Sequence, residues 1–302
     1  MNFSKKKFKL ALICFGIFNS PTEFFSQQTK GFKFGILAGA YFANNNTARI
    51  YDGYGYSSDK VKNNFETSSL NRKINFEYGG GNGQPDRIAK ELAVGTNEWI
   101  RITEKDMPIN MHYTPAFLIG FLGRYNLNEN SSVLFNFHTA RISATGNFTI
   151  ETIPSTNPSG VTWKTENIRT FLITGTEQRF SIQTGLQRYL SRNEIFNFFV
   201  EAGPVFNMVK AVNNKAIINS LQVDLTRQYN EYGNEIFRAR NMTGVDFGFF
   251  AGIGINLNTG SDWGVQILYN PAYERIGIGE NPGPFVQHSI GVRMYKAKKE
   301  VS

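Results

Sequence analysis

Histidine and serine are the first residue types to consider for chemistry, because serine hydrolases need both within reach of each other, with an acid that orients the imidazole. The chain has three histidines, His112, His138 and His288. His288 adjoins Ser289, and neighbours in an extended segment point to opposite faces. His138 has no serine two residues away, so only Ser181 on another segment remains open as its partner. The sequence therefore predicts that the protein is not an enzyme.

Other motifs that bind ligands are weak in this chain. The glycine-rich stretches at residues 78–83 and 277–283 do not join a strand to a helix, as a phosphate-binding loop would. The acidic residues at 86–106 lack the spacing of an EF-hand. We expect neither a metal ion nor a cofactor.

The elements that position these residues are predicted to be strands, because apolar side chains recur at every second position in eight segments. In residues 31–42, for example, Phe32, Phe34 and Ile36 share one face, and small or polar residues occupy most of the other. The eight segments are residues 31–42, 116–125, 132 onward, 172–190, 196–208, 245–256, 263–269 and 286–294.

The lengths of these segments and of their connections indicate the fold class. About ten residues suffice for a tilted strand to cross the hydrocarbon layer of a membrane. Short connections at residues 126–131, 191–195 and 257–262 alternate with long ones at 43–111, 151–163, 212–242 and 273–284. The predicted fold is all-β: a transmembrane antiparallel up-and-down β-barrel of about eight strands, with long extracellular loops and short periplasmic turns. A soluble β-sandwich with the same apolar rows in its core stays open as the alternative.

The N-terminal segment has the pattern of an export signal. Four lysines lie within the first nine residues, and the apolar run at residues 8–18 is too short to span a bilayer. We expect a signal peptide at residues 1–26, a single barrel domain at residues 27–302, and location in the outer membrane. The only cysteine, Cys14, would be removed with the signal. The formal charge of +8 could indicate nucleic-acid binding, but the basic residues are scattered and follow an export signal, so no nucleic acid is expected.

A set of charged and polar residues falls on the face opposite the apolar rows, which is the interior of a barrel. Opposite charges in this interior are expected to pair and fill it, because unpaired buried charge is costly and an eight-stranded barrel has room for little besides its own side chains. The predicted lumen network comprises Arg124, His138, Glu177, Arg179, Glu201, Asp246 and Arg293.

The connection at residues 43–111 is the candidate recognition element, since long loops are rare unless they are functional or disordered. Tyr51, Tyr54, Tyr56 and Trp99 supply aromatic side chains of the kind enriched at binding surfaces. Residues 84–94 begin near a proline and carry apolar residues four apart, which predicts a short helix over the barrel mouth. The alternative, that the loop only shields the barrel top, stays open.

Three stretches carry a family resemblance: MPINMHYTPAFLIGFLGRY at residues 107–125, VEAGPVF at 200–206 and IGVRMY at 290–295. With these, the chain resembles the PorT-like outer-membrane barrels of Bacteroidota, which are similar in architecture to the eight-stranded OmpA and OmpX barrels. The resemblance implies a barrel over residues 30–296 and, for PorT itself, an association with type IX secretion and gliding. The charged tail KAKKEVS after Tyr295 departs from the usual barrel ending.

The function expected from the sequence is that of a non-enzymatic outer-membrane barrel, acting as a scaffold, surface-interaction or secretion-accessory protein. The expected partners are outer-membrane lipid and a cell-envelope or secretion-system protein, and the barrel is expected to be monomeric. A narrow channel for small solutes is the alternative. A lipid-modifying enzyme is less favoured, because no adjacent serine and histidine can meet.

Overall fold

The computed structural model describes residues 31–57, 61–81, 85–96, 98–153, 167–191, 196–229, 235–238, 243–257, 263–278 and 283–296. The predicted signal peptide and most of the connection predicted at residues 151–163 lie outside these ranges. Within them, no helix has the length and apolar character needed to cross a membrane.

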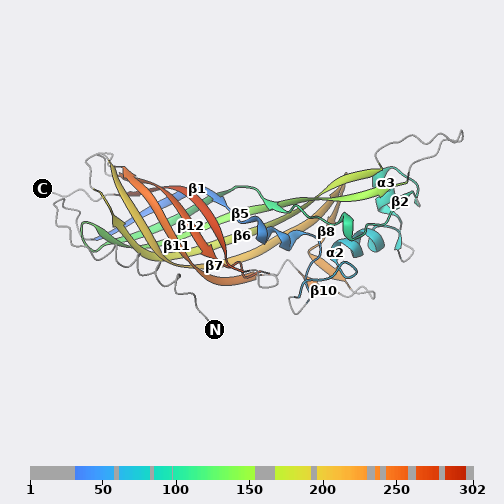
Figure 1. The fold of residues 1–302 in the computed structure, drawn as a ribbon, viewed down its shortest axis with the longest axis horizontal. Helices are drawn as coiled ribbons and strands as arrows, with labels where there is room; N and C mark the ends of the chain where they lie inside the picture. The colour runs from blue at the N-terminus through green and yellow to red at the C-terminus, as the bar shows by residue number, and fades with distance from the viewer. Residues whose placement is uncertain are drawn as a thin grey trace.

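Eight antiparallel strands close into a barrel (Figure 1): β1 (Gly31–Phe42), β4 (Ala116–Asn126), β5 (Ser131–Thr152), β6 (Ile168–Tyr189), β7 (Phe196–Ile218), β11 (Thr243–Leu257), β12 (Trp263–Glu274) and β13 (Phe285–Lys296). Each strand pairs with the next in this order, and β13 pairs with β1 to complete the ring. Each predicted segment overlaps one of these strands, so the prediction of an eight-stranded antiparallel barrel is confirmed.

The turn between β4 and β5 is tight, as its composition predicts. Asn128 accepts hydrogen bonds from the backbone N–H groups of Asn130 and Ser131, which closes residues 127–130 into a compact turn. The other two predicted short turns fall largely outside the described residues. Pairs such as Gly35 with Tyr295 place the start of the first strand beside the end of the last, at the end of the barrel that carries this turn.

The outward face of the barrel is apolar on all eight strands. On β11, Phe249 is 71% exposed and the next residue, Phe250, is 2% exposed, so the predicted alternation between the two faces is confirmed there. Phe32, Phe117 and Phe247 are about as exposed as Phe249 on three different strands. Exposed aromatic rows around a whole barrel are unfavourable in water and match a hydrocarbon environment.

Three strands are much longer than a membrane crossing needs, and for β7 this corrects the sequence interpretation, which ended that segment at residue 208. β5 and β6 have 22 residues each and β7 has 23, about twice what a tilted strand needs to cross the hydrocarbon layer. The stretch at residues 212–242, predicted as a loop, instead continues β7 to Ile218 and turns into β8 (Leu221–Asp224). The apolar rows end earlier because the extensions follow a different pattern of polar and apolar residues.

That different pattern is an inversion of polarity along the same strand. On β5 the outward face changes from Val133, Phe135 and Phe137 to threonine, arginine, serine and asparagine from residue 139 onward. The inward face changes from Asn136 and His138 to alanine, isoleucine and phenylalanine, which are buried. The barrel half of β5, residues 131–138, therefore has a polar interior and an apolar exterior. The half from residue 139 onward has an apolar interior and a polar exterior, as in a water-soluble protein.

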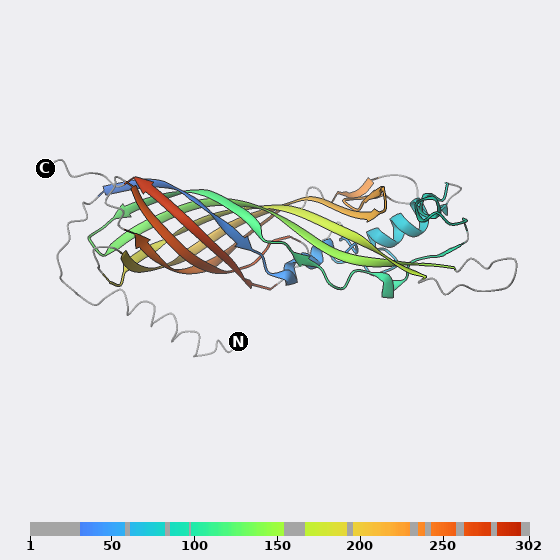
Figure 2. The same cartoon turned by 90° about the horizontal axis from the view of Figure 1, so that it is seen from above.

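The extensions carry a folded unit that we call the cap, made of the described residues within 43–115 together with 142–153, 167–176 and 211–225. It contains the 3-10 helices η1 (Asn45–Tyr51) and η4 (Glu104–Asp106), the helices α2 (Ser69–Asn71) and α3 (Arg87–Leu92), the π-helix η2 (Arg72–Glu77), and the strands β2 (Trp99–Ile100), β3 (His112–Tyr113) and β8. β2 and β3 pair with β5. A further pair, β9 (Arg227–Tyr229) and β10 (Glu235–Arg238), follows β8. Figure 2 shows the cap as an elongated continuation of one side of the barrel.

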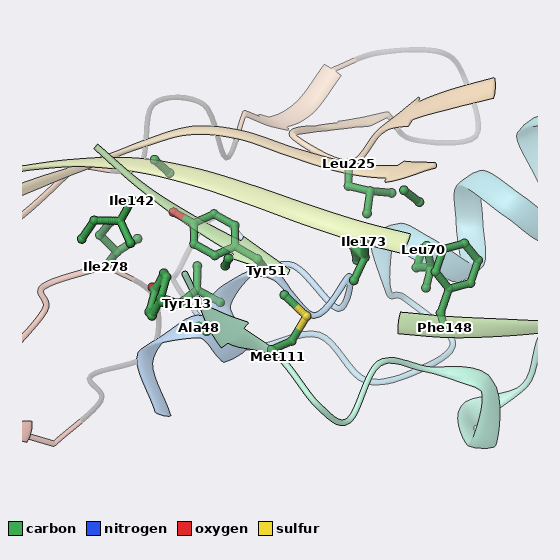
Figure 3. Close-up of a cluster of buried hydrophobic side chains, with 14 of the residues drawn as sticks. Ala48, Tyr51, Leu70, Met111, Tyr113, Ile142, Phe148, Ile173, Leu225 and Ile278 are labelled. Carbon is green, nitrogen blue, oxygen red and sulfur yellow. The ribbon is translucent and has the colours of Figure 1, made fainter. Parts of the chain in front are cut away.

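The described residues of the segment 43–111 are therefore folded over the extended strands rather than loose. Their side chains share one buried cluster with the extensions, in which Tyr51, Leu70 and Met111 lie against Ile142, Phe148 and Ile173 (Figure 3). The predicted helix at residues 84–94 exists as α3, with Asp86 as its N-cap. It lies at the far end of the cap and is held by hydrogen bonds from Asn219 and Ser220 to Glu91, not over the barrel mouth (Figure 1).

Candidate functional site

Two regions of the molecule could carry function: the lumen of the barrel and the surface of the cap. In the lumen, Arg293 of β13 donates two hydrogen bonds to Glu201 of β7, at 2.6 Å and 2.7 Å from its two terminal nitrogens to the two carboxylate oxygens. Both side chains are almost fully buried. This pair, held by two parallel hydrogen bonds, joins the non-neighbouring strands β7 and β13 and lies in the interior of the barrel.

A second buried pair lies where the barrel meets the cap. Arg179 donates to Glu177, two residues away on β6, and also to the hydroxyl of Tyr41 and the side chain of Gln287. Tyr41 in turn donates to Glu274 of β12. The cluster links β1, β6, β12 and β13 across the mouth of the barrel.

The cap closes this cluster from above. Tyr51 of η1 and Tyr113 of β3 both donate hydrogen bonds to Oε2 of Glu177, at 2.9 Å and 3.1 Å. Burial and then the neighbouring charge of Glu177 raise the pKa of both tyrosines, so both hydroxyls stay protonated and act as donors. Thr47 of η1 accepts a bond from Arg179. The mouth is thus sealed by hydrogen bonds between the first connection and the barrel wall.

A third polar group fills the end of the barrel near the turns. Arg124 donates to the hydroxyl of Tyr189 and to Gln266, and its guanidinium lies 4.9 Å from the ring centre of Tyr295. Tyr295 donates to Asn256. Polar side chains from five strands, β4, β6, β11, β12 and β13, therefore meet in this layer, which fills the end of the lumen near the turns.

The remaining lumen residues take different positions. His138 is buried, as expected for its inward parity, and pairs in register with Ser181. A nucleophilic serine would donate its hydroxyl hydrogen to the imidazole of His138. Ser181 instead donates to Asn207. Asp246 is half-buried, and its carboxylate accepts from the backbone N–H of Phe247 rather than joining one of the two ion pairs described above.

The other two histidines lie outside the lumen. His112 is exposed on β3, beside Thr145 at 3.2 Å. His288 faces outward, as its parity predicts, where it stacks on Tyr269 and shares a hydrogen bond of 2.7 Å with its hydroxyl. Among the described residues, no group of three His, Cys, Asp or Glu side chains is arranged to hold a metal ion.

The aromatic residues proposed for recognition mostly lie inside the cap. Tyr51, Tyr56 and Trp99 are 1%, 6% and 7% exposed, and the indole N–H of Trp99 donates to Asp86. Tyr54 is half-buried, with the ammonium of Lys62 over its ring. A recognition role for the loop stays a prediction, but the side chains of Tyr51, Tyr56 and Trp99 contribute to its packing rather than to its surface.

The exposed apolar residues of the cap were missed by the sequence interpretation. Ile109 is 93% exposed beside β5, Ile168 is 60% exposed at the start of β6, and Phe76 is 50% exposed on η2. These residues lie well away from the barrel rows. Single apolar residues outside the alternating rows carry no periodic signal, so only the structure separates them from core residues.

Comparisons with known proteins give a fold similarity alone. No family model matches the chain, and no curated protein matches it. The assignment to PorT-like proteins of Bacteroidota is therefore unsupported. Two crystal structures of Ail, the attachment invasion locus protein of Yersinia pestis, align with the chain at 10% identity and a TM-score of 0.32. One of them contains the heparin analogue sucrose octasulfate; they cover 87% and 88% of this chain and 97% and 99% of Ail. A similarity at this level carries no argument about function.

Proposed function

We propose that the protein is an outer-membrane β-barrel that anchors the cap at the cell surface as a scaffold or surface-interaction module. The observation that carries this proposal is the inversion of polarity along β5, β6 and β7. Apolar residues face outward in the barrel half, whereas in the cap half they face a buried core. One sheet thus has a lipid-facing part and a water-facing part, and the cap continues the barrel wall without a linker.

Export and membrane insertion are part of the same proposal. The pattern of residues 1–26 favours export through a cleaved signal peptide. The apolar outward rows favour insertion of the barrel, and the closed ring of strands satisfies the backbone groups that a membrane cannot. An envelope or secretion protein that contacts the cap would make the protein a secretion accessory.

A channel is less favoured than an anchor. The Arg293–Glu201 pair, the bonds of Arg179 to Tyr41 and Gln287, and the layer around Arg124 each join different strands across the lumen. Opening a path for solutes would separate buried opposite charges, which is costly. An enzymatic role is also less favoured, because Ser181 is bonded to Asn207 rather than to His138.

The proposal can be tested with a photo-crosslinking amino acid at Ile109 in the cap, with the same substitution at lipid-facing Phe249 as the matched control. Cell fractionation should place the protein in the outer membrane, and protease added to intact cells should cut within the cap. A discrete protein adduct is expected from Ile109 and not from Phe249. Recovery in the soluble fraction, or adducts at Phe249 alone, would contradict the proposal.

A further inference from the structure

The outward face of the eight strands has an unusual distribution of charge. Among the described residues of these strands, Glu151 is the one acid on the outward face, and it lies near the end of the β5 extension. The other acids on these strands take inward-facing positions. Basic residues, in contrast, occur where the apolar rows end. Arg141 and Lys210 are both exposed there.

Arg141, Gln178 and Lys210 form one row across three neighbouring strands. Arg141 of β5 pairs in register with Gln178 of β6, and Gln178 pairs with Lys210 of β7. Side chains at directly paired positions lie on the same face, so the amide of Gln178 stands between the two cations. With neighbouring strands about 4.8 Å apart, the backbones of Arg141 and Lys210 are separated by about 10 Å.

The position of the row relative to the apolar surface is equally specific. The adjacent row on the barrel side is Thr139, Phe180 and Met208, also paired in register. On the cap side, Ser143 pairs with Thr176, and both are uncharged. The cations therefore lie at the boundary between the apolar rows and the water-facing part of the sheet, which is the level of lipid headgroups in an inserted barrel.

Within the described residues, neither cation makes an ion pair with an acid of the protein itself. The guanidinium of Arg141 and the ammonium of Lys210 carry only hydrogen-bond donors, and the amide of Gln178 carries two donors and one acceptor oxygen. All three groups end long, flexible side chains. This donor set suits a phosphate group, which arginine can bind through two parallel bonds and lysine as a point charge.

We infer that Arg141, Gln178 and Lys210 bind the phosphate of a lipid headgroup in the membrane leaflet on the cap side. The inference rests on the proposed insertion of the barrel, because insertion brings headgroups to this row. Bound lipid would fix the depth and rotation of the barrel and thereby the orientation of the cap.

The test uses the complete folded protein in neutral detergent, titrated with phosphatidic acid and, separately, with diacylglycerol of the same acyl chains. Native mass spectrometry counts the bound lipid. The wild type should retain phosphatidic acid in preference to diacylglycerol. The double variant Arg141→Gln/Lys210→Gln should weaken that binding by about tenfold or more. The matched control Lys90→Gln/Lys105→Gln, which removes two exposed cations from the cap, should bind as the wild type does.

Several outcomes would overturn the inference. Equal binding of the two lipids, equal binding by both double variants, or complete displacement of the lipid by inorganic phosphate at the lipid's own concentration would each do so. Should the double variant fail to fold, the charge-conserving Arg141→Lys decides: it keeps the cation but loses the two parallel bonds, and unchanged affinity would refute the phosphate contact. Insertion into vesicles is measured separately, so a failure of the proposed membrane anchor is recognised apart from a failure of lipid binding.

Discussion

Breaking the Arg293–Glu201 pair should destabilise the barrel strongly. The two groups approach within 2.6 Å and 2.7 Å and are nearly inaccessible to solvent. At a charge separation of about 4 Å and an effective dielectric constant of about 20, their attraction is about 4 kcal/mol. Glu201→Gln removes it while leaving a buried guanidinium that cannot lose its proton. We expect a loss of about 3–5 kcal/mol in the free energy of unfolding.

The double variant Glu201→Leu/Arg293→Met separates an ion pair from simple loss of packing. It removes both charges together and keeps similar side-chain volumes, so it should cost far less than the sum of the two single replacements. The wild type, Glu201→Leu, Arg293→Met and the double variant are compared by urea unfolding in phospholipid vesicles, followed by tryptophan fluorescence. If the single losses merely add up in the double variant, the two groups are independently solvated and the filled-lumen interpretation is wrong.

Three further predictions concern the lipid face, the cap and the lumen. Phe249→Arg should cost about 2–4 kcal/mol, because it places a charge in hydrocarbon; unchanged gel mobility of unheated samples on urea titration would contradict this. Gly175→Val should release the first connection from the sheet, because the new Cβ would lie 2.1 Å from Cγ of Tyr51. Tyr51→Phe keeps the packing but loses the hydrogen bond to Glu177, which should lower the free energy of unfolding by about 1.5–3 kcal/mol. Equal protease resistance of the wild type and Gly175→Val would refute the contact. Planar-bilayer recordings should show no steady channel, and reproducible conductance of the wild type would overturn the paired lumen.

The barrel could be predicted from the sequence because a strand between lipid and lumen must alternate strictly. Phe249 and Phe250 are chemically identical, yet parity alone assigns one to the exterior and the other to the interior, as the structure has them. Parity does not identify the neighbours of an inward residue. Phe250 packs with Leu134, Val205 and Ala272 in a small apolar cluster inside the lumen. Inward parity alone suggests that a polar replacement of Phe250 is tolerated, but this packing means that the replacement should destabilise the barrel.

The extensions could not be predicted from the same rule. Beyond Lys210, the pairing of β6 with β7 shifts between Thr176 and Glu177, where Ala211 and Asn213 are the successive partners. The extra residue, Val212, reverses the parity of β7 and ends the row that marks a membrane strand. At the same level the apolar face turns inward, so the segment that follows has the polar exterior of a loop although it remains in the sheet.

The folded cap also changes what a deletion can test. Removing residues 45–97 would uncover Ile142, Phe148 and Ile173, which are at most 1% exposed, and would deprive Glu177 of its bond from Tyr51. The barrel hydrogen bonds would remain, but the extended strands would expose their apolar face to water, so the shortened protein should aggregate or be digested along residues 142–152. Loss of partner binding in such a protein would then report loss of folding. Substitutions at exposed positions such as Ile109 keep the core intact, and only a loss of binding in those variants assigns recognition to the cap surface.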